Sequence, residues 1–183
     1  LYIQWSLLRG IKVWHWIEYT FTAALLAHTI LYFSGMLSIR TQLIGYAAQS
    51  TLMLIGLLQD ILRHCCLLGI LNFEAVRGIL LFSFAVGFFN VLSVWMPSLY
   101  KLFVNNSEID APPFVRWIVL SEFILYTSFG FAQLAFYTPF LIHGPTYRVR
   151  FFEEELVLSS LSFIAKAVLA SAFSVCLVYQ QCG

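Results

Sequence analysis

Five long apolar segments dominate this chain and limit it to one class of fold. A helix that crosses a bilayer needs about 20 mostly apolar residues. Runs of that length alternate with short polar breaks along the sequence, which predicts an all-α integral membrane protein with five transmembrane helices in a single domain over residues 1–183. The approximate predicted spans are 14–39, 42–62, 78–99, 114–141 and 156–179.

Composition agrees with a bilayer and excludes several other classes of protein. Hydrophobic residues make up 61% of the chain and charged residues only 10%, which leaves too little polar surface for a water-soluble domain of this length. The 10 Lys and Arg nearly balance the 9 Asp and Glu, so no charge excess suggests a nucleic-acid partner. The sequence shows no metal-ligand spacing and no converging nucleophile, base and orienting group. We therefore expect neither a metal site nor an enzyme.

Loop charges predict an orientation, because cytoplasmic loops of membrane proteins retain Lys and Arg. With the N-terminal side of the first span in the cytoplasm, six basic residues lie inside and three outside, and the C-terminus is outside. The chain opens on Leu1 without an initiator Met, from which we expect an N-terminally truncated fragment. The inside residues are Arg9, Lys12, Arg63, Arg77, Arg148 and Arg150, and the outside residues are Arg40, Lys101 and Arg116.

Lys166 places a charged side chain inside a predicted membrane span. It lies about ten residues inside the fifth span, roughly 15 Å deep, which exceeds the reach of its side chain to either interface. A desolvated lysine can form a Schiff base with a carbonyl ligand, because burial favours the neutral nucleophile, although a structural lysine paired with a carboxylate fits equally well. Ser159 and Ser162 share its helical face, where they either line a polar stripe or bond their own backbone.

Two carboxylates within predicted spans are candidate site residues. Glu18 lies near the start of the first span with His15 one turn before it, and it is either an interfacial residue or a counterion for a buried cation. Glu122 lies about eight residues inside the fourth span beside Tyr126, as a proton-relay carboxylate or a hydrogen-bond donor between helices. His15 is a second candidate for proton relay.

Several segments of the chain resemble the heliorhodopsin family of retinal-binding membrane proteins. Residues 16–20 (W-I-E-Y-T) look like the W-V-E-Y-S motif that begins the family's third helix, and residues 56–60 (G-L-L-Q-D) resemble the G-W-L-Q-E motif at the end of its fourth. Residues 158–166 are similar to its S-L-V-A-K retinal-lysine helix, and residues 121–133 follow its sixth helix. The resemblance covers nearly the whole chain. It implies helices 3–7 of a seven-helix bundle, with the first two helices absent.

The resemblance also implies a cofactor and its contacts. All-trans retinal would be bound covalently to Lys166 as a protonated Schiff base, with Glu18 as its counterion and Ser162 as the hydroxyl close to the linkage. Three of the four residues that would line the chromophore depart from the family's usual Asn, Met and Phe, so the absorption maximum cannot be transferred. These four are Gln49, Leu52, Tyr126 and Thr127.

The function that the resemblance implies is light sensing in a membrane. We expect a homodimeric photoreceptor in the lipid bilayer with a slow photocycle that signals to an unknown partner rather than pumping ions. Two alternatives stay open: a light-gated proton conductor that uses Glu122, and a membrane protein without chromophore in which Lys166 and Glu18 are a structural ion pair. A visible absorption band and a photocurrent that depends on Glu122 separate the three.

Overall fold

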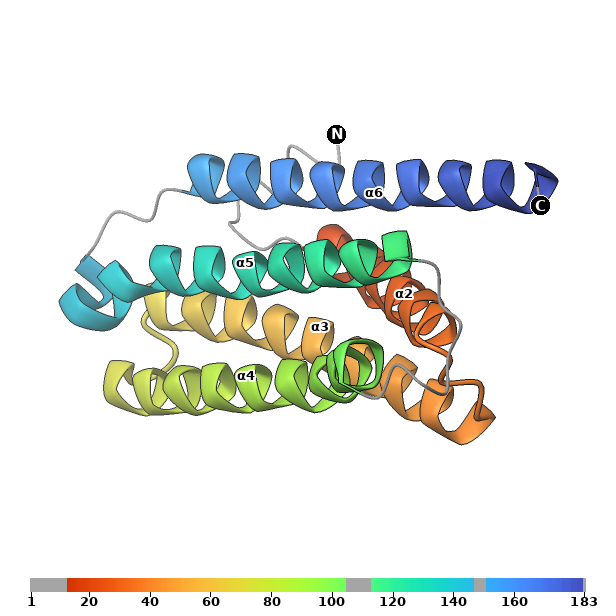
Figure 1. Cartoon of the computed structure of the whole chain (residues 1–183). Helices are drawn as coiled ribbons and strands as arrows, with labels where there is room; N and C mark the ends of the chain where they lie inside the picture. Colours follow the sequence, from red (N-terminus) through yellow and green to blue (C-terminus); the bar gives the residue numbers. More distant parts are fainter. Residues whose placement is uncertain (1–12, 105–112, 147–150, 183) are drawn as a thin grey trace.

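The computed structural model describes residues 13–104, 113–146 and 151–182, and this part of the chain is all-α, as predicted. In Figure 1, the helices α3 to α6 run alternately in opposite directions, and α6 lies along α5. The helices are α2 (Val13–Phe33), α3 (Ile39–Leu67), α4 (Phe73–Phe103), α5 (Pro113–His143) and α6 (Phe151–Cys182), with a short 3₁₀ helix, η2 (Gly144–Thr146), after α5.

Three of the described helices are long and apolar enough to cross a membrane: α3, α4 and the stretch Phe114–His143 of α5. Most of their side chains point outward rather than into the bundle, including Phe82, Phe89 and Phe131, which are 71%, 69% and 62% exposed. Water would make such a surface aggregate, whereas lipid chains cover it without cost. The arrangement of the apolar side chains therefore fits a bilayer.

The first predicted span was too long at its C-terminal end. It extended to Ile39, but α2 ends at Phe33, and residues 34–38 form a turn before α3. Gly35 adopts a φ of 69°, in the left-handed region where glycine avoids a Cβ clash, and Met36 N donates to Leu31 O at 3.0 Å. The apolar residues that follow this glycine continue the hydropathy signal without continuing the helix. The other four helices extend beyond the predicted limits at both ends.

Glycines on α3 let α2 approach closely. A Cβ atom at Gly56 would overlap the ring of Trp16, and a Cβ at Gly45 would overlap the side chain of Leu31. Small residues at such crossings allow helix backbones to come near each other in membranes, where packing drives association. The Gly56 contact matters most here, because it fixes where the Trp16 ring can lie.

Replacing Gly56 with alanine is expected to lower the free energy of unfolding by about 1–3 kcal/mol, because the Trp16 ring must move to admit the methyl group. Gly78→Ala is the matched control, since a Cβ there meets no heavy atom within 4 Å, and it should be neutral or stabilise the helix by about 0.5–1 kcal/mol. Thermal unfolding in detergent, followed by circular dichroism, compares the two variants. Equal effects would argue against the Trp16 contact.

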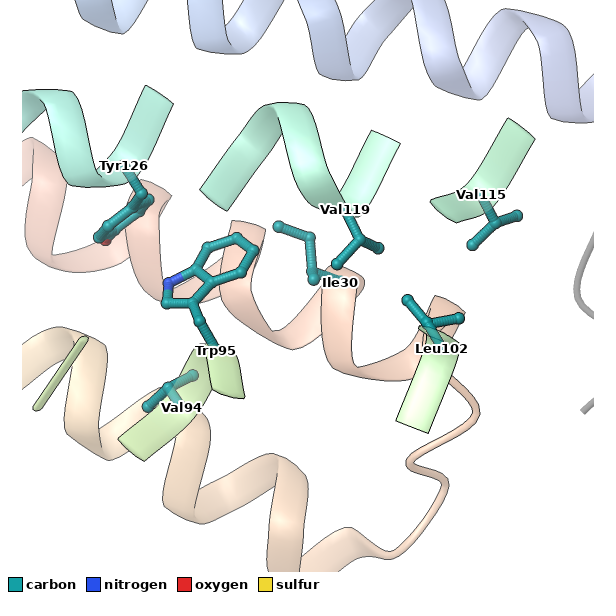
Figure 2. Packing of buried hydrophobic residues seen from close by; sticks show 7 residues of the cluster. All are labelled: Ile30, Val94, Trp95, Leu102, Val115, Val119 and Tyr126. Atoms are coloured by element: carbon teal, nitrogen blue, oxygen red, sulfur yellow. The ribbon is translucent and has the colours of Figure 1, made fainter. Parts of the chain in front are cut away.

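Two buried clusters hold the bundle together. The first joins α2, α4 and α5, and Figure 2 shows the side chains from α5 pointing toward Trp95, Leu102 and Ile30. The second joins α3, α4 and α5 nearer the other ends of these helices and includes Leu80, Tyr137 and Phe140. The first cluster consists of Ile30, Val94, Trp95, Leu102, Val115, Val119 and Tyr126.

Candidate functional site

Lys166 on α6 and Glu18 on α2 form an ion pair in the structure. The Lys166 Nζ atom lies 2.7 Å from Glu18 Oε1, although the two residues are 148 positions apart in the chain. Their side chains are 52% and 49% exposed, so the amine remains accessible from outside the described bundle. The structure thus brings the predicted reactive lysine and the predicted counterion into direct contact.

A cavity of about 660 Å³ extends from Lys166 into the bundle, and residues of α2, α3, α4, α5 and α6 all contribute to its wall. It adjoins both buried clusters, because Tyr126 belongs to the first cluster and Phe84 packs against the second. The volume lies within the range of about 300–1,000 Å³ that is usual for small-molecule sites. The aromatic part of the wall comprises Trp16, Tyr19, Phe84, Phe88, Tyr126, Phe129 and Phe131.

Most polar groups in this wall already have partners. Thr127 Oγ1 donates to the Phe123 carbonyl at 2.8 Å, in the same way as other threonines of the wall bond their own helix. Gln133 Nε2 donates to Gln59 Oε1 at 2.8 Å, and Gln59 Nε2 donates to Ser83 Oγ at 2.6 Å. Because these polar groups bond to their own helices or to one another, the cavity is mostly apolar, with the Lys166 amine at its edge.

The predicted lining residues fall into two groups. Leu52, Tyr126, Thr127 and Ser162 contribute to the wall together with Lys166, and Ser162 lies beside the Tyr19 hydroxyl. Gln49 is not among the residues that line the cavity, and its side chain is fully buried. A contact between Gln49 and a chromophore stays a prediction.

Gln49 and Glu122 stand out because they are fully buried without hydrogen-bond partners. Both amide atoms of Gln49 and both carboxylate oxygens of Glu122 are unpaired, and the same holds for the Tyr126 hydroxyl and Trp95 Nε1. Buried polar groups normally have partners, so each exception calls for an explanation such as bound water or a protonated carboxyl group. Glu122 does not line the cavity, whereas Tyr126, one helical turn later, does.

His15 contacts a second carboxylate on the face that carries Glu18. Its Nδ1 atom contacts Glu155 Oε1 on α6, and Ser159 Oγ donates to the same oxygen at 3.5 Å. Glu155 was not selected from the sequence, because it precedes the predicted fifth span. The structure therefore adds a carboxylate to the predicted relay residue His15, one helical turn from Glu18.

The sequence model of the heliorhodopsin family matches residues 2–176, nearly the whole chain. The chain belongs to the heliorhodopsin family. No curated protein and no solved structure matches the chain. Family membership makes this a membrane protein of a group of rhodopsin-like photoreceptors, with retinal as the implied cofactor.

One group of charges in this heliorhodopsin was missed by the sequence analysis. Arg63 was assigned to a cytoplasmic loop, but it lies in α3 and is fully buried, because the helix continues to Leu67. It forms ion pairs with Asp60 and Glu154, and both of these carboxylates are also buried. Arg63 and Glu154 lie just beyond predicted spans, where ionisable residues are normally solvated, and Asp60 lies within the last turn of one, so the pattern did not show that the three form a buried cluster. Among the residues that the structure describes, no group of His, Cys, Asp and Glu could hold a metal ion.

Proposed function

We propose that this heliorhodopsin is a light sensor that carries all-trans retinal covalently on Lys166 as a protonated Schiff base, with Glu18 as counterion. The observation that supports this most strongly is the position of Lys166, which lines an apolar cavity while its Nζ atom lies 2.7 Å from the Glu18 carboxylate. A reactive amine needs a hydrophobic binding volume beside it, and a positive charge formed at its nitrogen needs a nearby anion.

The residues present fit retinal. The cavity volume, about 660 Å³, is large enough for a ligand of this size. Its wall of aromatic rings suits a rigid apolar chain that needs few polar anchors. When bound, retinal supplies the absorption of visible light and a double bond that isomerises. Lys166 would hold one end and Glu18 would stabilise the positive charge, while Ser162 and Tyr19, whose hydroxyls bond each other, line the same cavity.

The membrane arrangement follows from the same proposal. The five described helices correspond to helices 3–7 of a seven-helix bundle, so α2 and α6 cross the bilayer beside α3, α4 and α5. The N-terminal side of α2 faces the cytoplasm. Arg77 and Lys101 lie at opposite ends of α4 and so favour neither orientation, whereas the remaining basic loop residues favour this one. The protein acts as a homodimer and signals to a partner not yet identified.

The ion pair itself argues against a purely structural role. Both side chains are about half exposed, and an exposed pair contributes at most about 1 kcal/mol in water. In lipid, the same exposure would be unfavourable rather than stabilising. A lysine kept at this depth is better explained by the cavity that it borders.

The proposal is tested by the visible spectrum of the full-length protein purified after addition of all-trans retinal. We expect an absorption band at longer wavelength than free retinal, because the Glu18 carboxylate stabilises the charged linkage. A protein that folds but gives only the spectrum of free retinal would contradict the photoreceptor function and favour the structural alternative.

A light-gated proton conductor is the second candidate, and the unpaired carboxyl group of Glu122 favours it. A carboxyl group without fixed partners is free to exchange a proton with buried water. Tyr126, one helical turn later, lines the cavity, so the carboxyl group lies near the cavity wall that a conductor would use.

We expect no steady photocurrent from cells that express the full-length protein, because Glu122 is fully buried and does not open into the cavity. Voltage-clamp recording of the wild type and of Glu122→Gln measures this directly. A current in the wild type that disappears in the variant would establish the conductor, whereas a pigment without current in either protein agrees with the sensor.

A further inference from the structure

Trp16 is held in the cavity wall from two sides. Its ring lies against Gly56 so closely that α3 tolerates no side chain there, and its Nε1 atom donates to Asp60 Oδ2 at 2.8 Å. Only 7% of the residue is exposed. A flat contact on one side and a directional hydrogen bond on the other leave the indole one orientation. Asp60 itself does not line the cavity.

Asp60 also anchors other helices. The Tyr137 hydroxyl on α5 donates to Asp60 Oδ1 at 2.6 Å, and the Arg63 guanidinium lies 3.1 Å from the same oxygen. Arg63 in turn reaches across to α6, where its Nη1 atom lies 3.1 Å from Glu154 Oε2, and its guanidinium stacks 4.1 Å above the Tyr137 ring. One carboxylate thus connects α2, α3, α5 and, through Arg63, α6.

Burial makes the bonds of this cluster costly to break. Asp60, Arg63 and Glu154 are each 1% exposed or less, and a buried charge that loses its partner is strongly unfavourable. The helices are therefore restricted to positions that keep all these bonds. Glu154 lies twelve residues before Lys166 on the same helix, about 18 Å along the axis, so fixing Glu154 fixes the register of Lys166.

We propose that Asp60 is a positioning residue for the chromophore: it orients the Trp16 ring in the cavity wall and, through Arg63 and Glu154, sets the position of the helix that carries Lys166. This inference rests on the proposed function, because it assumes that the cavity holds retinal. A cluster that only stabilised the fold would affect unfolding but would leave the environment of the chromophore unchanged.

The first experiment compares Asp60→Asn with Glu74→Gln in the full-length protein loaded with all-trans retinal. Glu74 is a matched control, because it also pairs with an arginine three residues later, Arg77, but at 4.0 Å on the exposed surface. In Asp60→Asn we expect a shifted visible band and dark bleaching by hydroxylamine that is faster by about tenfold, since a loosened wall admits the reagent more often. Glu74→Gln should match the wild type. A band and a bleaching rate in Asp60→Asn equal to those of the wild type would overturn the proposal.

Trp16→Phe provides a second test, because it removes the indole N–H, and with it the bond to Asp60, and leaves a smaller aromatic ring at this position. We expect the same direction of change in bleaching, and this variant decides the question if Asp60→Asn does not fold. An unchanged bleaching rate in Trp16→Phe would then overturn the proposal.

A third measurement needs no retinal. In the protein purified without retinal, Trp16→Phe combined with Asp60→Asn should lower the unfolding temperature by less than the sum of the two single decreases, because both variants affect the same bond. Fully additive decreases would show that Trp16 and Asp60 act independently and would contradict the inference. Absence of any visible band in the wild type would instead argue against the proposed function, with this cycle still reporting on the Asp60 contact.

Discussion

Replacing Lys166 with alanine is expected to abolish the visible absorption band completely. Lys166 is the only lysine among the residues that line the cavity, and without its amine no covalent linkage can form there. The comparison is made on protein purified with all-trans retinal, by recording the spectrum of the wild type and of the variant at equal protein concentration.

The control for this loss is Lys101→Ala. Lys101 lies on α4, and its Nζ atom donates to the Gly35 carbonyl at 2.8 Å, away from the cavity. Alanine is a strong helix former, so neither substitution should unfold its helix, and far-ultraviolet circular dichroism verifies this. A visible band that survives in Lys166→Ala, or vanishes in Lys101→Ala with the fold intact, would show that the linkage has been assigned to the wrong lysine.

Replacing Glu18 with glutamine is expected to remove most of the visible band at neutral pH and to produce absorption in the near ultraviolet. The Glu18 carboxylate lies 2.7 Å from Lys166 Nζ, so the variant loses the anion that stabilises a positive charge on that nitrogen. The neutral linkage then predominates. Acidification supplies the proton by mass action and should restore the visible band.

A pH titration of the absorption spectrum measures this effect in Glu18→Gln and in the exposed control Glu74→Gln. Glu74 is 74% exposed and contacts Arg77, so its variant should titrate as the wild type does. An unchanged visible band in Glu18→Gln at neutral pH would mean that another group serves as counterion. Glu155 would then be the next residue to test, because it lies on the Lys166 helix and contacts His15.

The reactive pair could be selected from the sequence because charges inside apolar spans are rare. Lys166 and Glu18 each interrupted a hydrophobic run, and the motif resemblance then assigned them complementary roles. The distance between the two side chains could not be predicted in either way, because it depends on how α6 packs near α2. The helical content was equally predictable, because apolar runs of this length have few alternatives to a helix in lipid.

Errors arose where hydropathy alone placed a boundary. The first span was continued past Gly35, and the second was ended at Leu62, which moved Arg63 from a buried ion pair into a loop. Hydropathy scores each charge as solvated, so it cannot find a charge whose partner comes from another helix, as Glu154 does here. The sequence also could not show that Gln49 is not among the residues that line the cavity, since helical period fixes a direction only when the neighbouring helices are known.

Covalent attachment of retinal to Lys166 can be tested by locating the retinyl group on the chain. The full-length pigment is treated with borohydride, which reduces a carbon–nitrogen double bond to a stable amine, and is then digested and analysed by mass spectrometry. We expect one retinyl group on the peptide that contains Lys166, and none on peptides that contain Lys12 or Lys101. A retinyl group on another residue, or a visible pigment without any adduct, would contradict attachment to Lys166.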